Sequence, residues 1–148
     1  MLRYNHRKGN YLRNQITDGG IKMNGQIITN IHEDIVKVLI ERLQNKQGHP
    51  AFTYDELCKK IGNQVNCRNI APYLGDISCW CDEIGAPMIS VMVINRNNNR
   101  PGKGFYKLYA ELHGTSIRNI DEELTFISEL KKVQKYRNWE EVKFYLGI

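Results

Sequence analysis

The chain has 148 residues and a formal net charge of +5, with 41% hydrophobic and 25% charged residues. These values describe one ordinary globular domain, large enough to bury roughly two-thirds of its unfolded surface without disulfides or metals. No apolar run approaches the roughly 20 residues of a membrane span, and residues 1–25 lack the apolar core of a secretory signal. We therefore expect a cytoplasmic protein with no membrane partner.

Basic residues gather in two segments. Residues 1–25 hold five Lys and Arg against one acid, and residues 95–107 hold four with none. Two basic patches on a near-neutral body are typical of a protein that binds a polyanion such as DNA. Lys and Arg that merely solvate loops would give the same composition, so this alternative stays open.

The first 25 residues show little periodicity, and we interpret residues 1–25 as a basic arm that is either flexible or a hairpin. Residues 26–148 would form a single domain. Within it, apolar residues recur at helical spacing from about Asn30 to Asn45, which predicts a scaffold helix.

The central stretch predicts two short helices joined by a tight turn. Thr53 and Glu56 have the spacing of a capping box at a helix start, and Gly62 is suited to the position after a helix end. The next helix is expected to begin at about Cys67 or Asn69. This order of elements is that of a helix-turn-helix.

Residues 88–94 are nearly all apolar and rich in β-branched side chains, which predicts a buried strand. Residues 95–104 are rich in turn-forming Asn, Gly and Pro, and residues 105–108 would form a return strand, so that the three segments make a β-hairpin wing. Helices are expected over 120–133 and 139–146. The predicted fold is therefore α+β: a winged helix-turn-helix with an N-terminal basic arm and a C-terminal helical extension.

Four cysteines lie in the central stretch, namely Cys58, Cys67, Cys79 and Cys81. Without a secretory signal we expect them to be reduced thiols. The Cys-Trp-Cys spacing at Cys79 and Cys81 does not match a zinc knuckle, and the histidines are dispersed along the chain. The sequence therefore predicts no metal site and no cofactor.

Tyr54, Gly62, Asn63, Arg68 and Gly75 follow one another at a recognisable spacing. This pattern resembles the DNA-binding half of the alkylguanine–DNA alkyltransferases and the alkyltransferase-like proteins. The resemblance implies that Arg68 enters the minor groove in the space left by a flipped nucleotide, while Tyr54 presses on the adjacent phosphate.

The catalytic motif of that family, Pro-Cys-His-Arg, is missing, because residues 87–94 contain no Cys, His or Arg. A thiolate nucleophile also needs a nearby base or positive field, and no histidine lies in the helices that carry the cysteines. We therefore expect no enzymatic activity. An alternative reading of the site is that Tyr54 packs on the following helix and that Arg68 pairs with Asp55 or Glu56.

The predicted function is nonenzymatic binding of double-stranded DNA, extending to the sensing of modified or flipped bases. Groove contacts are assigned to Arg68 and Asn69, and phosphate contacts to the arm and the wing. The full set of predicted DNA-binding residues is Tyr54, Asn63, Arg68, Asn69, Arg96, Arg100, Lys103, Arg3, Arg7 and Lys8.

A second, looser resemblance is to domains found beside HNH endonucleases and in bacterial or phage defence-related proteins, although the chain has no HNH constellation of its own. It supports an alternative function with a host or phage protein as partner. In this alternative the chain is a small phage or prophage protein that inhibits a host nucleic-acid-binding defence system through protein interaction.

Overall fold

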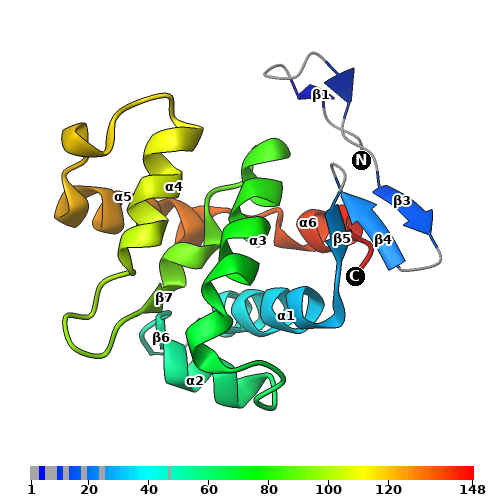
Figure 1. Ribbon diagram of the computed structural model, residues 1–148, viewed down its shortest axis with the longest axis horizontal. Helices are drawn as coiled ribbons and strands as arrows, with labels where there is room; N and C mark the ends of the chain where they lie inside the picture. Colours follow the sequence, from blue (N-terminus) through cyan, green and yellow to red (C-terminus); the bar gives the residue numbers. More distant parts are fainter. Residues whose placement is uncertain (1–3, 6–9, 12–13, 18–19, 24–25, 47) are drawn as a thin grey trace.

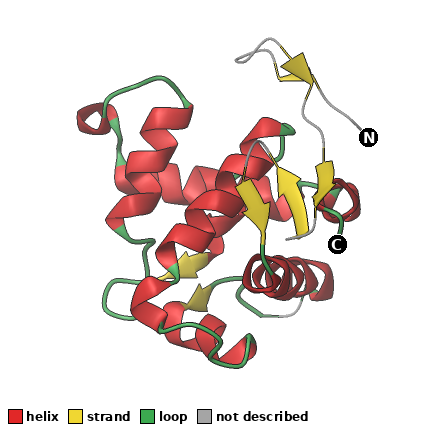
Figure 2. Cartoon of the chain, turned by 45° about the vertical axis from the view of Figure 1, so that its right-hand side comes forward, coloured by secondary structure: helices red, strands yellow, loops and turns green. Residues whose placement is uncertain are grey.

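The structure is a computed structural model that describes residues 4–5, 10–11, 14–17, 20–23, 26–46 and 48–148. Its helices are α1 (Asn30–Asn45), α2 (Tyr54–Lys60), α3 (Ala71–Glu83), α4 (Lys103–Leu112), α5 (Glu122–Lys135) and α6 (Trp139–Leu146), with 3-10 turns η1 (Cys67–Asn69), η2 (Ile89–Met92) and η3 (Ile117–Asn119). Its strands are β1 (Tyr4–Asn5), β2 (Asn10–Tyr11), β3 (Asn14–Thr17), β4 (Gly20–Met23), β5 (Gln26–Ile28), β6 (Phe52–Thr53) and β7 (Val93–Ile94). Helices dominate the molecule, so the α+β class holds in its general sense (Figure 2).

The described strands form three small sheets. β1 and β2 are antiparallel, and β3, β4 and β5 form an antiparallel meander. The meander lies at the same end of the molecule as α6 and the C-terminus in both views (Figures 1 and 2). The predicted arm residues Arg3, Arg7 and Lys8 lie outside the described residues.

Several predicted helices are confirmed with their boundaries. α1 spans Asn30–Asn45, although its N-cap is Thr29 rather than Asn30. α6 spans Trp139–Leu146, and the Trp139 indole is buried and donates its N–H to the carbonyl oxygen of Val133 at 3.2 Å. Trp139 is therefore a core anchor.

The predicted β-hairpin wing is not present. Residues 105–108 belong to α4, and residues 89–92 form η2, which leaves only Val93–Ile94 as strand. This strand is parallel to β6, with Phe52 opposite Val93. The physical reason is that Phe105, Tyr106 and Ala110 bury one face of a helix, whereas the prediction considered only the first four residues of this periodic segment.

The apolar run at residues 88–94 is buried in the middle of the core rather than in an extended sheet. Ser90 lies in this run, and it accepts a hydrogen bond from the Ser78 hydroxyl of α3 at 2.6 Å, while its own N–H donates to Ser78 at 3.3 Å. These bonds satisfy polar groups inside the core and hold η2 against α3. The segment therefore forms a compact turn between helices instead of a strand of a hairpin.

His32 is buried where α1 meets α3, with 4% of its surface exposed. Its ring lies 4.9 Å from that of Tyr73 and 4.8 Å from that of Trp80. Nδ1 accepts the backbone N–H of Thr29 at 3.0 Å, so the neutral ring carries its proton on Nε2, which lies 3.0 Å from Asp76. Burial lowers the pKa of His32 below its ordinary value, although the hydrogen bond with Asp76 acts in the opposite direction.

The helical spacing of Leu124, Ile127 and Leu130 predicts a buried face for α5 that differs from the observed one. Leu124 and Ile127 are exposed at 64% and 41%, whereas Phe126, Glu129 and Val133 are buried. Aromatic bulk at Phe126 and the polar anchor at Glu129 thus fix the rotation of α5. Among the residues that the structure describes, no helix combines the length and apolarity needed to cross a membrane.

Candidate nucleic-acid interface

The turn between α2 and η1 has the geometry that its sequence predicted. Thr53 caps α2, and the reciprocal bonds with Glu56 are formed at 3.2 and 3.0 Å. Gly62 and Asn63 follow the helix with φ values of 76° and 53°, in the left-handed region. The N–H of Asn63 donates to the carbonyl oxygen of Cys58 at 2.9 Å, so Asn63 serves as a turn residue with its side chain exposed.

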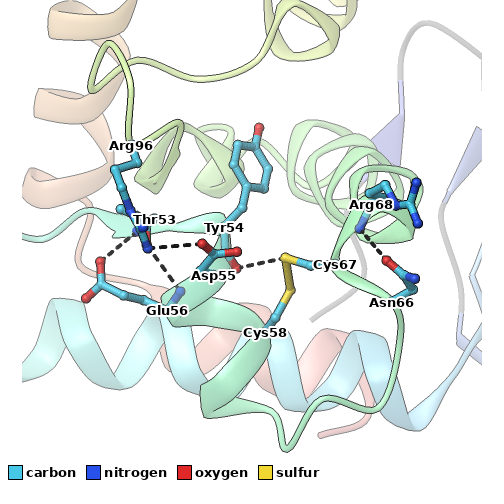
Figure 3. The surroundings of a disulfide bond; sticks show 9 residues. All are labelled: Thr53, Tyr54, Asp55, Glu56, Cys58, Asn66, Cys67, Arg68 and Arg96. Atoms are coloured by element: carbon cyan, nitrogen blue, oxygen red, sulfur yellow. Dashed lines mark hydrogen bonds and ion pairs between the residues drawn. A yellow bond between two sulfur atoms is a disulfide. The ribbon is translucent and has the colours of Figure 1, made fainter.

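A disulfide joins Cys58 of α2 to Cys67 of η1, which corrects the prediction that all four cysteines are reduced (Figure 3). The two Cα atoms are 5.9 Å apart and nine positions apart in sequence. Sγ of Cys67 lies 3.2 Å from the carbonyl oxygen of Tyr54. The disulfide therefore fixes the start of the second helix of the motif relative to the first residue of α2.

Arg68 is exposed on η1, where its backbone N–H donates to the Asn66 side chain at 3.0 Å. No ion pair joins its guanidinium to an acid within residues 26–46 or 48–148. The two acids considered as partners are engaged elsewhere: Asp55 binds Arg96 at 3.0 Å, and Glu56 accepts the N–H of Thr53. The pairing alternative for Arg68 is therefore excluded.

Small residues follow Arg68 at the start of α3. Ala71 and Pro72 are exposed, and a Cβ added at Gly75 would meet no atom within 4 Å. Arg68 itself lies in the 3-10 turn η1, which leads into α3 through Ile70, so these residues form one continuous stretch of the chain, here called the face that begins at Arg68. This stretch combines an exposed guanidinium with backbone that a groove wall can approach closely, and Asn69 within it is also exposed.

Tyr54 connects the start of this face to the start of α4. Its hydroxyl accepts the N–H of Gly102 at 3.2 Å, while its carbonyl oxygen lies near Cys67. Glycine suits this close approach, since a Cβ at position 102 would lie 3.0 Å from the Tyr54 hydroxyl and would oblige the tyrosine to shift slightly. Arg68 and Lys103, each next in sequence to one of these contacts, are therefore held at the two ends of one tyrosine.

Lys103 is exposed in the first turn of α4, whose N-cap Gly102 provides no side-chain hydrogen bond. No ion pair joins Lys103 to an acid within the described part of the chain. The positive end of a helix dipole does not stabilise the Lys103 ammonium. A phosphate, in contrast, is attracted both to this ammonium and to the N-terminus of the helix. The start of α4 therefore suits contact with an anion.

Arg100, predicted as a free cation of the wing, is a structural residue instead. Its guanidinium donates two hydrogen bonds to Glu123 of α5, one of them at 2.7 Å, and lies 4.7 Å from the centre of the Phe126 ring. The hydrogen bond from Arg100 lowers the pKa of Glu123, and the same bond raises the pKa of Arg100. This bidentate pair fixes the loop to α5 and leaves Arg100 little capacity for DNA.

Arg96 is also paired, but with Asp55 and with both side chains well exposed, at 71% and 58%. Exposed ion pairs are weak, so this guanidinium can exchange its carboxylate for a phosphate. In Figure 3, Arg96 and Arg68 lie at opposite ends of the labelled group, with Tyr54 and the disulfide between them. The structure thus places Tyr54 between Arg68 and Arg96 and bonds it to the residue before Lys103, whereas Arg100 is engaged by Glu123.

The two remaining cysteines of α3 do not form a metal site. No group of three or more potential ligands that could hold a metal is present among the described residues. Burial raises the pKa of Cys81 to about 12, so this thiol stays protonated at neutral pH.

Sequence reasoning missed two contacts that define this surface. One is the bond from Gly102 to Tyr54, which joins positions separated by 48 residues. The other is the neutralisation of Arg100 by Glu123, which joins the loop to a helix that the sequence assigned only to packing. The available signal for the helix that brings Gly102 to Tyr54 was the helical spacing of the apolar residues from Phe105 onward.

Neither a protein-family model, nor a curated protein, nor a solved structure matches the chain. The likeness to the alkyltransferases therefore stays a prediction drawn from the sequence.

Proposed function

We propose that the chain is a nonenzymatic DNA-binding protein that places the face beginning at Arg68 in a groove of duplex DNA. The observation that carries this proposal is the exposed guanidinium of Arg68 at the head of a face of small residues, with no acid of the described chain paired to it. A planar cation with free donors can bind base edges or phosphates, and small neighbours let the backbone approach.

Phosphate contacts would come from Lys103 with the start of α4, from the Tyr54 hydroxyl and from Arg96 after release of Asp55. Tyr54 already accepts the N–H of Gly102, so its own proton can be donated to a phosphate oxygen. The finer prediction, that this surface senses a modified or flipped base, belongs to the same proposal and depends on the same guanidinium. Without a hairpin wing, the proposal depends on α2, the turn after it and α3, the segment predicted as a helix-turn-helix.

The test is a fluorescence-anisotropy titration of the full chain against random, modified and mismatched duplexes. Arg68→Ala should weaken binding by roughly 1–3 kcal/mol. The chain offers a matched control in Arg118, which occupies a 3-10 turn of the same construction: its N–H donates to the capping Ser116 at 3.3 Å. Arg118→Ala removes the same charge from the same local structure and should leave affinity nearly unchanged.

Salt dependence adds a second measurement. If about four phosphates are neutralised, the logarithm of the binding constant should fall with the logarithm of salt concentration with a slope of roughly −4. Equal weakening by Arg68→Ala and Arg118→Ala would show that only overall charge matters, and it would contradict the groove role of Arg68.

A second candidate function is a protein-interaction module, here an inhibitor of a host nucleic-acid-binding defence system. The observation that favours it is the exposure of Leu124 and Ile127, which are three positions apart on α5 and share a face. This alternative predicts no binding to random duplex and the recovery of a single partner protein in a pull-down. Leu124→Ser would abolish that recovery, whereas Arg68→Ala would not.

A further inference from the structure

A pocket of about 480 Å³ opens between the end of α3, the segment that follows it and α5. Its lining includes the apolar residues Ala86, Pro87 and Met88 together with charged side chains of α5. Its volume falls in the usual range for pockets that hold small molecules. None of its lining residues belongs to the surface proposed to contact DNA.

Glu129 supplies a buried carboxylate to this pocket. Its relative exposure is 3%, and its Oε2 accepts the backbone N–H of Met88 at 2.9 Å. Oε1 has no hydrogen-bond partner among the described residues; it forms an ion pair with the Nζ atom of Lys132 at 3.7 Å, which is longer than a hydrogen bond. A buried carboxylate oxygen without a donor is costly, so a ligand N–H placed there would recover free energy.

The charges around the pocket balance. Two carboxylates, Asp82 and Glu129, line it together with two ammonium groups, Lys132 and Lys135. A ligand with only a positive charge would be repelled by both lysines, and a ligand with only a negative charge would be repelled by both acids. A ligand that carries one charge of each sign, close together, satisfies both and leaves the site neutral.

We propose that this pocket binds a free α-amino acid with an apolar side chain. The ligand ammonium donates to Oε1 of Glu129, and the ligand carboxylate binds Lys132 with Lys135 beside it. The side chain packs on the apolar residues Ala86, Pro87 and Met88. Because Oε1 is covered in the unliganded chain, Lys132 swings from Glu129 to the incoming carboxylate, which its 57% exposed side chain permits.

The first test uses the full chain without DNA, so that its outcome is independent of the proposed DNA binding. L-leucine, L-methionine, L-phenylalanine and L-tryptophan are each titrated by calorimetry, with thermal unfolding as a second readout. At least one should bind and raise the melting temperature. For L-phenylalanine, the analogues 3-phenylpropionate and phenethylamine lack the ammonium and the carboxylate respectively, and each should bind at least about tenfold more weakly than the amino acid.

Variants then assign the two charged contacts. Glu129→Gln keeps an oxygen to accept the N–H of Met88 but removes the charge opposite the ligand ammonium, and it should weaken binding about tenfold or more. Lys132→Gln should do the same from the carboxylate side, and it tests the proposal even if the Glu129 variant folds poorly. Lys131→Gln is the matched control, because Lys131 is exposed on the same helix and does not line the pocket.

The expected pattern is loss of binding in Glu129→Gln and Lys132→Gln with no change in Lys131→Gln. The proposal is overturned if none of the four amino acids binds at about 10 mM, a concentration at which even weak small-ligand sites fill. It is equally overturned if phenethylamine binds as tightly as L-phenylalanine, since the site would then recognise a cation alone.

Discussion

Two substitutions of Gly75 test the stability of α3 and its proposed contact with DNA separately. Gly75 lies inside α3, away from the left-handed region, and an added Cβ meets no atom within 4 Å. Glycine inside a helix costs about 1 kcal/mol relative to alanine, through the entropy that its backbone loses on folding. Gly75→Ala should therefore raise the free energy of unfolding by about 1 kcal/mol, or the melting temperature by about 3 °C.

Gly75→Trp tests the function of the same open space. The indole would project from the face that begins at Arg68 and prevent its approach to a groove, while the helix itself should be no less stable than with glycine. We expect DNA affinity to fall at least about tenfold by anisotropy. Gln134→Trp, on the exposed surface of α5, is the control for added aromatic bulk and should bind DNA normally.

Two results would refute this reasoning. Unchanged DNA affinity in Gly75→Trp would mean that α3 does not enter a groove through this face. A loss of stability in Gly75→Ala, measured by urea unfolding, would mean that the space around the helix is filled.

Three further outcomes are expected. His32→Gln should flatten the pH dependence of stability between about pH 7 and 5: burial holds the pKa of folded His32 below 6.5, so the unfolded chain binds the proton first and stability falls as the pH drops below that value. Urea unfolding at several pH values measures this dependence. If the free energy of unfolding of His32→Gln changes with pH as steeply as that of the parent chain, His32 is not the group responsible. Cys58→Ser opens the disulfide to Cys67 and should cost roughly 3 kcal/mol, a difference from the parent chain that a reductant should abolish in thermal unfolding. Thr53→Ala removes the cap of α2 and should lower the free energy of unfolding, measured by chemical denaturation, by about 1 kcal/mol. Thr53→Ser keeps the capping hydroxyl and should retain most of the stability.

Much of the local structure was determined by the sequence alone. The capping box of Thr53 and Glu56, the turn at Gly62 and the limits of α6 all depend on residues close together in the chain. Such signals need only helix geometry and the hydrogen-bonding needs of the first turn, so they can be found without knowing what packs against the helix.

Tertiary structure decided the rest. The run at residues 88–94 has high strand propensity, but it is buried in the core, where Ser90 accepts a hydrogen bond from Ser78 and the N–H of Met88 donates to Glu129, so only its last two residues form a strand. Whether Arg100 was free depended on Glu123, which lies 23 positions away and reaches it only through the packing of α5. Local propensity cannot specify such distant partners, because burial and charge pairing act between surfaces that the fold brings together.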